Sequence, residues 1–101
     1  MERTMTFLKP IYDSRKSFYN KAIVTENVIL LDGGTTLRAD GEKHLYSYNT
    51  EVCYIDRNNN VHLLPKWNFS QTTLRHIKEF LKQNGIKAES KAQIEKDYFV
   101  A

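Results

Sequence analysis

The chain has 101 residues, of which 41% are hydrophobic, 12% aromatic and 27% charged, with a formal net charge of +3. These values are typical of one globular domain and exclude a long disordered chain. No stretch approaches the roughly 20 apolar residues of a membrane span or forms a signal peptide. The single cysteine, Cys53, excludes an intramolecular disulfide. We therefore expect a reduced protein of the cytoplasm with no membrane partner.

The charge is uneven along the chain. Residues 1–22 and 73–101 are mildly basic, whereas residues 23–72 carry a small acidic excess. This balance excludes a DNA mimic, which needs a dense acidic surface, and it is far below the charge of a dedicated DNA-binding protein. Basic ends favour an anionic partner, but a solvated surface of mixed charge explains them equally.

The residues between 18 and 65 predict an antiparallel meander of about four to six short strands. Aromatic and β-branched residues favour a strand over 18–25, and the turn residues Asp32-Gly33-Gly34 follow a short apolar run over 27–31. Further short strands are expected over 35–38, 43–48, 51–56 and 61–64. Turns are expected at Asn49-Thr50 and at residues 57–60, because asparagine tolerates the left-handed backbone of tight hairpins.

Two helices are expected after the sheet. Ser70 is an N-cap candidate, the apolar residues Leu74, Ile77, Phe80 and Leu81 repeat at helical spacing, and Gly85 ends the first helix at about residue 85. A short second helix over 90–98 begins with Ser90 as its cap. The chain is thus predicted to be a single α+β domain, in which an amphipathic helix and a short second helix pack against the sheet.

The sequence contains no phosphate-binding loop, nucleophile elbow, zinc-protease helix or dinucleotide fingerprint. Cys53 with His44 or His62 could form a thiol–histidine pair or a cross-strand metal site, but a cysteine among apolar strand residues is typically inert core packing. We expect no enzyme activity, no cofactor and no metal.

Two groups of side chains are candidates for binding. The first comprises Tyr46, Tyr48 and Tyr54 on neighbouring predicted strands, which could stack on nucleobases or contact a protein if one sheet face is uncovered. The alternative is that these rings fill the core or form cross-strand pairs.

The second group is a basic stripe of Arg75, Lys78 and Lys82 beside the apolar side of the first helix, where it could contact phosphates. The alternative is a solvated face, in which Arg75 pairs with Glu79 one turn away. His76, on the opposite flank, has no evident folding role and is a further candidate.

The C-terminal half resembles an uncharacterised family of small proteins encoded by phages, prophages and plasmids of low-GC Gram-positive bacteria. The resemblance rests on two segments, a strand pair and the start of a helix. The matching residues are Ser47, Tyr48, Thr50, Val52 and Ile55, and then Trp67, Phe69, Ser70, Thr72, Thr73, Arg75, His76, Ile77, Glu79 and Phe80. Two segments resemble additions to this pattern, residues 1–17 and residues 26–42. We interpret residues 1–17 as an N-terminal extension of the domain.

The resemblance implies an accessory protein of a phage or mobile element. Such proteins often bind and block a host protein, including CRISPR nucleases and other defence enzymes. The leading hypothesis is therefore a small non-catalytic inhibitor that contacts a host protein through the tyrosines or the 26–42 segment. The alternative is a nucleic-acid-binding module that uses the basic stripe with exposed tyrosines.

Overall fold

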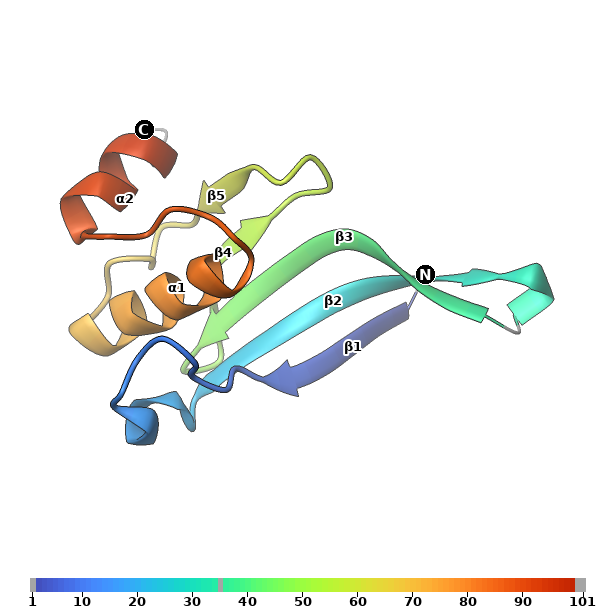
Figure 1. Cartoon of the computed structure of the whole chain (residues 1–101), viewed down its shortest axis with the longest axis horizontal. Coiled ribbons are helices and arrows are strands. Elements are labelled where there is room, and N and C mark those ends of the chain that lie inside the picture. The colour runs from blue at the N-terminus through green and yellow to red at the C-terminus, as the bar shows by residue number, and fades with distance from the viewer. Residues whose placement is uncertain (1, 35, 100–101) are drawn as a thin grey trace.

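The structure, a computed structural model, describes residues 2–34 and 36–99, and its five strands form one antiparallel sheet in the order β1-β2-β3-β4-β5 (Figure 1). The strands are β1 (Glu2–Phe7), β2 (Ala22–Leu31), β3 (Thr36–Ser47), β4 (Thr50–Ile55) and β5 (Val61–Leu63). The helices are α1 (Gln71–Gln83) and α2 (Lys91–Tyr98), with short 3-10 turns at Lys16–Tyr19 and Asp32–Gly34. The predicted α+β meander with two helices is confirmed.

The core lies between α1 and one face of the sheet. Leu45 from β3 and Ile55 from β4 are buried there with Ile77 and Phe80 from α1. Trp67 is also buried and closes the end of the core towards Phe99. Within the described residues, α1 covers one face of the sheet and no helix covers the other face (Figure 1). Within the described part of the chain, no helix is long and apolar enough to cross a membrane.

The N-terminal segment is part of the sheet, which corrects its interpretation as an extension. Residues 2–7 form β1, which pairs with β2 from Glu2↔Val28 to Phe7↔Ile23. The alternation of Thr4, Met5, Thr6 and Phe7 is the period-2 signal that could have predicted this strand. The expected strand over 18–25 is also too early, since Lys16–Tyr19 is a 3-10 turn and β2 begins at Ala22.

The strands β2 and β3 are longer than expected and form one continuous hairpin. The predicted short strands over 27–31 and 35–38 continue into the strands before and after them. A register irregularity between Glu26 and Val28 lies opposite Gly41, whose φ of +92° favours glycine. Beyond Val28 and Ala39, neither strand pairs with a further strand in the described part of the chain, so the hairpin end projects from the sheet as a two-stranded ribbon (Figure 1).

The two helices begin and end where the sequence predicts. The Ser70 hydroxyl accepts the Thr73 N–H at 3.1 Å, and the Ser90 hydroxyl accepts the Gln93 N–H at 3.1 Å. Gly85, with φ +73°, follows α1, and the Ile86 N–H donates to the Leu81 carbonyl at 2.9 Å. These contacts satisfy backbone groups that a helix end leaves unpaired.

Candidate functional site

The β3–β4 turn and the segment before α1 meet at a hollow of about 240 Å³. Tyr48 from the turn and Phe69 from the segment both line it, and they are 46% and 67% exposed. The buried residues Val52 and Thr73 line the same hollow, as does Lys66. A hollow of this size with exposed aromatic rings at its edge suits a single side chain of a partner.

Tyr48 occupies a backbone conformation that tyrosine rarely adopts. The β3–β4 loop consists of Tyr48 and Asn49, with φ values of +52° and +66°, which is the pattern of a type I′ hairpin turn. The turn is one residue earlier than expected, so Tyr48 belongs to the turn and not to a strand. Asparagine and glycine are favoured at both positions, and a bulky side chain there is strained.

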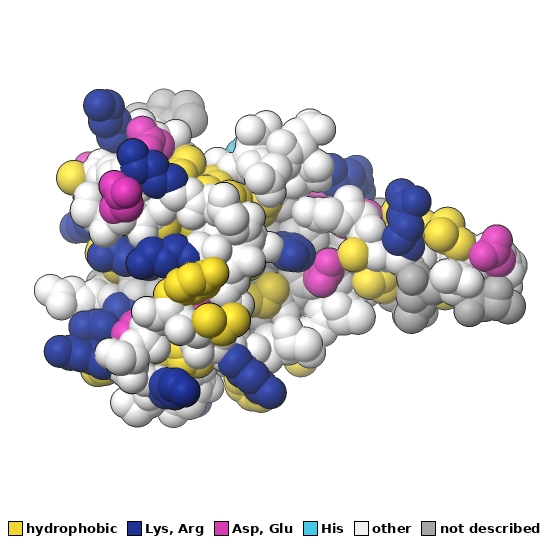
Figure 2. All heavy atoms as spheres, in the orientation of Figure 1, with side chains coloured by type: hydrophobic (Ala, Val, Ile, Leu, Met, Phe, Trp, Pro, Cys, Tyr) yellow, Lys and Arg dark blue, Asp and Glu magenta, His cyan; other side chains and the backbone are white. Residues whose placement is uncertain are grey.

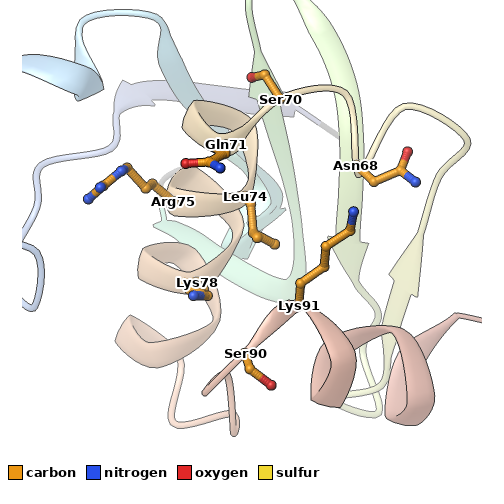
Figure 3. Close-up of a pocket in the computed structure, with 8 residues that line it drawn as sticks. All are labelled: Asn68, Ser70, Gln71, Leu74, Arg75, Lys78, Ser90 and Lys91. Carbon is orange, nitrogen blue, oxygen red and sulfur yellow. The ribbon is translucent and has the colours of Figure 1, made fainter.

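A second hollow, of about 620 Å³, lies between α1 and the start of α2 and is lined by Asn68 and Ser70, the chain neighbours of Phe69 (Figure 3). Leu74 and Lys78 from α1 line it together with Lys91, whose side chain extends towards Asn68. Lys66, Lys78 and Lys91 have no ion-pair partner among the described residues. The lysines are therefore free to attract an anionic group.

We use the name α1-start surface for the five residues Tyr48, Lys66, Phe69, Lys78 and Lys91. Figure 2 shows that Lys and Arg side chains outnumber acidic ones over the helical end of the molecule. Two carboxylates near α1 are already engaged: Asp13 binds Arg75, and Glu79 is buried. The α1-start surface thus combines exposed aromatic rings with uncompensated positive charge.

The predicted basic stripe is kept together in the structure, since Arg75, Lys78 and Lys82 all line one hollow of about 170 Å³ near Tyr12. Arg75 contacts Asp13 at 3.3 Å, and its guanidinium lies 5.2 Å from the centre of the Phe18 ring, so it does not form the expected pair with Glu79. In Figure 3 its side chain points away from Lys91. Lys82 is exposed, and Arg75 and Lys78 also line the hollow of about 620 Å³. Among these three residues, Lys78 is the one that belongs to the α1-start surface.

His76 has a clear folding role, which corrects the expectation that it had none. Its ring is wholly buried, its Nε2 atom contacts the Phe18 carbonyl, and its Nδ1 atom lies 2.8 Å from the Ser47 hydroxyl. Because a carbonyl only accepts, Nε2 is assigned the proton and Nδ1 accepts from Ser47. Burial lowers the pKa of His76, although the Phe18 carbonyl acts in the opposite direction. A partner cannot reach this imidazole in the folded chain.

The remaining predicted tyrosines lie on the helix-free face of the sheet. Tyr54 stacks between His44 and His62, with ring centres 5.1 and 4.5 Å away. The strand register places Tyr46 on this same face, two residues from His44. The ring of Tyr48 lies instead 6.2 Å from that of His76, on the side of α1. The three tyrosines therefore do not form one patch, and Tyr54 adopts the alternative of cross-strand packing.

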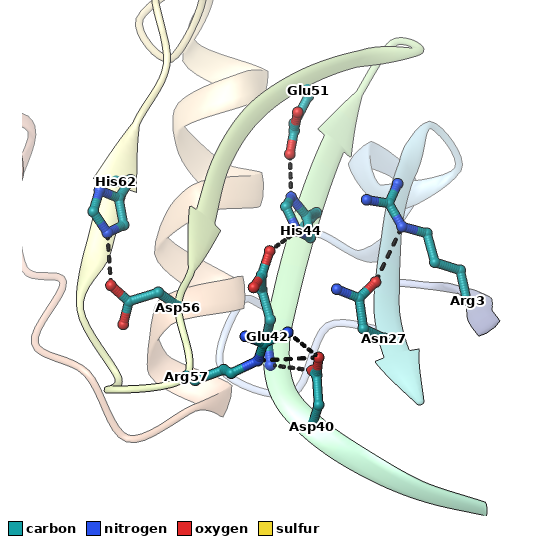
Figure 4. Close-up of polar contacts among 9 residues, drawn as sticks. All are labelled: Arg3, Asn27, Asp40, Glu42, His44, Glu51, Asp56, Arg57 and His62. Carbon is teal, nitrogen blue, oxygen red and sulfur yellow. Dashed lines mark hydrogen bonds and ion pairs between the residues drawn. The ribbon is translucent and has the colours of Figure 1, made fainter. Parts of the chain in front are cut away.

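Carboxylates surround the stacked rings of the helix-free face (Figure 4). His44 contacts Glu42 through Nε2, at 2.8 Å, and Glu51 through Nδ1, while His62 lies 2.8 Å from Asp56. The contact with His62 is the largest cause that lowers the pKa of Asp56. Asp40 and Arg57 form a further ion pair nearby. These polar groups largely satisfy one another, so this face offers fewer free charges than the α1-start surface.

The cysteine does not join the histidines. Cys53 is wholly buried in the core, and burial raises the pKa of its thiol. His44 and His62 lie on the helix-free face, so the thiol–histidine pair and the shared metal site considered from the sequence are both ruled out. Among the described residues, no group of three or more His, Cys, Asp or Glu side chains is placed to hold a metal ion.

Sequence reasoning missed Lys66, Phe69 and Lys91. Phe69 directly precedes the N-cap residue Ser70, where the chain runs over the surface, so an aromatic residue there was a signal for an exposed ring. The positions of the two lysines depend on the path of residues 64–70 and on where α2 lies in the fold. No local pattern could have shown this.

The family of unknown function DUF8033 matches residues 6–96. The chain belongs to this family. The matched span includes residues 26–42 and begins at residue 6, whereas the sequence pattern alone led us to treat 1–17 and 26–42 as additions. No curated protein matches the chain, and no solved structure does.

Proposed function

We propose that this DUF8033 protein is a non-catalytic binding protein that attaches to a host protein through the α1-start surface and inhibits it. The observation that carries the proposal is the pair of exposed aromatic rings, Tyr48 and Phe69, beside a hollow that Lys66 also lines. Aromatic residues at the centre of a patch contribute most of the binding energy in many protein interfaces, and the surrounding charges guide association.

The strain at Tyr48 supports a binding role for this ring. A tyrosine at φ +52° costs stability that asparagine or glycine would not cost. Strained residues persist mainly where the side chain has a function. Phe69 supports the same conclusion, because most of its ring is exposed to solvent and contributes little to the core.

The charge of the surface defines the chemistry of the partner. Lys66, Lys78 and Lys91 favour a region that carries carboxylates beside a protruding apolar side chain. The resemblance to phage and plasmid proteins supports a defence enzyme, such as a CRISPR nuclease, as the protein that is inhibited. In such a role the protein would act by covering a surface that its target needs.

Nucleic acid is the second candidate partner, and one observation favours it. Exposed aromatic rings beside free lysines are also how single-stranded nucleic acids are bound, by stacking and by phosphate contacts. Arg75 pairs with Asp13 and lies over the Phe18 ring, and the Asp13 carboxylate partly neutralises the charge that would attract a phosphate. We therefore favour a protein partner.

The proposal is tested by affinity capture from a lysate of a low-GC Gram-positive bacterium, with and without nuclease, at about 50 and about 200 mM salt. We expect one host protein to be captured in stoichiometric amount. Its capture should persist after nuclease treatment and should change little between the two salt concentrations. Phe69→Ser should reduce its capture by roughly 10- to 30-fold, the effect of a hot-spot residue.

Ile11→Ser is the matched control, because Ile11 is also largely exposed but lies away from the α1-start surface. Capture that disappears with nuclease and falls steeply with salt would replace the protein partner with nucleic acid. Equal loss with Ile11→Ser and Phe69→Ser would contradict the assignment of the surface.

A further inference from the structure

The strand β1 lies at the edge of the sheet, and one of its sides has no strand partner among residues 2–34 and 36–99. The Leu8 N–H donates to the Ala22 carbonyl at 2.9 Å. Because backbone groups alternate in direction along an antiparallel strand, those of Thr4 and Thr6 also point to β2. The N–H and C=O groups of Arg3, Met5 and Phe7 therefore point out from the sheet edge. Such an unpaired edge is a template for another strand.

The side chains of this edge are unusually apolar for one exposed to solvent. Met5 and Phe7 are 70% and 63% exposed, and the strand register places both on the helix-free face together with Arg3. Natural sheets usually protect a free edge with charged residues, proline or a covering segment. In β1, Arg3 is the one charge among these three outward-facing positions.

We propose that β1 pairs with β1 of a second copy of this chain, antiparallel and symmetric about Met5, to form a dimer with one continuous sheet. In this register Met5 faces Met5 of the second copy, and Arg3 faces its Phe7 across the two-fold axis. The Met5–Met5 and Arg3–Phe7 pairs have outward backbone groups, and each exchanges two hydrogen bonds. The Arg3 guanidinium then lies beside an aromatic ring, which is a favourable cation–π arrangement.

The neighbouring registers are less favourable. Symmetry about Thr6 would place Arg3 opposite Lys9 of the second copy, and like charges directly opposite one another destabilise a strand pair. Symmetry about Thr4 would pair Arg3 with Met5 and leave Phe7 without a partner within the strand. The register about Met5 places no like charges opposite one another and pairs every outward-facing side chain of β1, as a self-complementary two-fold interface requires.

The dimer is tested by sedimentation equilibrium and by site-specific cross-linking of the full chain. We expect the wild-type protein to sediment at twice the chain mass at a concentration of about 100 μM, as suits a small interface. Met5→Pro should sediment as a monomer with an unchanged circular dichroism spectrum, because the lost N–H points away from β2.

Cross-linking remains informative if Met5→Pro fails to fold. Facing residues in hydrogen-bonded pairs have Cα atoms about 5.5 Å apart, which suits a disulfide. Met5→Cys should therefore form a linked dimer on mild oxidation, while Thr4→Cys, which faces Thr6 of the second copy, should not. Buried Cys53 is protected from this reaction. A monomeric wild-type protein, or equal cross-linking of the two variants, would overturn the proposal.

Discussion

At the scale of single residues, Tyr48 is expected to lower the stability of the fold and His76 to raise it. Tyr48 is exposed and held in a strained turn, whereas His76 is buried and bonded on both ring nitrogens. Both belong to the segments that carry the sequence resemblance. One is best explained by binding and the other by folding, and stability measurements separate the two explanations.

Replacing Tyr48 with asparagine should stabilise the fold and weaken partner capture. Asparagine tolerates the left-handed backbone, so we expect the free energy of unfolding to rise by about 0.5–1 kcal/mol. Urea unfolding of Tyr48→Asn and the capture assay measure the two effects. A destabilised variant with normal capture would show that Tyr48 is a packing residue.

His76 should make stability fall as the solution becomes more acidic. Because its pKa is lowered in the folded state, the unfolded chain takes up a proton first as the pH falls through about 6.5. The free energy of unfolding therefore decreases from that pH down to the folded-state pKa. Below the folded-state pKa, His76 is protonated in the folded and the unfolded chain, and the free energy of unfolding stops decreasing on its account.

The comparison of His76→Gln with the wild type isolates this effect from the other titrating groups. We expect the variant to be less stable at pH 7 and to have a flatter stability profile between about pH 5 and 7. If urea unfolding gave the same pH dependence of stability for His76→Gln and the wild type, the result would contradict a buried, neutral His76. The pKa values of Asp13, Asp40 and Asp56 are also lowered, and these carboxyl groups change the free energy of unfolding in a separate pH range, below about pH 3.8.

At the scale of elements, the N-terminal segment is attached to α1 through one buried carboxylate. The Glu79 oxygens accept the backbone N–H groups of Ile11, Tyr12 and Asp13 at 2.8–3.2 Å. Gln83 donates to the same carboxylate at 2.6 Å. This contact fixes the path from β1 to β2 and explains why Glu79 is buried without a cationic partner.

Glu79→Ala should destabilise the protein by about 2–3 kcal/mol, since it leaves partly buried N–H groups without an acceptor. Glu89→Ala, on an exposed side chain, should change the free energy of unfolding by less than about 0.5 kcal/mol. Thermal or urea unfolding measures both. Similar values for the two variants would show that the Glu79 contacts add little to stability.

The elements that could be predicted are those with strong local signals. Ser70, Gly85 and the apolar stripe of α1 define a helix whatever surrounds it, so its bounds were predicted within two residues. The path of residues 8–19 could not be predicted, because it depends on Glu79, which is more than 60 positions away. The β2 and β3 strands were divided in the prediction because polar residues and Gly41 interrupt their apolar pattern near residues 26–27 and 39–42.

At the scale of the whole molecule, the sheet separates two different surfaces. The helix-free face carries histidines and carboxylates that bind one another, while the helical side carries free lysines and exposed rings. The predicted tyrosines lie on both surfaces. The side chains alternate along each strand and Tyr48 lies in the β3–β4 turn, so neighbouring tyrosines point to opposite sides of the sheet. Composition alone could not assign them.

The α1-start surface is tested most directly by photo-cross-linking in a low-GC Gram-positive host. A benzophenone-bearing phenylalanine analogue replaces Phe69 in one variant and Tyr46, on the helix-free face, in another. We predict that the analogue at position 69 cross-links to a single host protein and that the analogue at position 46 does not. Cross-linking from position 46 and none from position 69 would contradict the account.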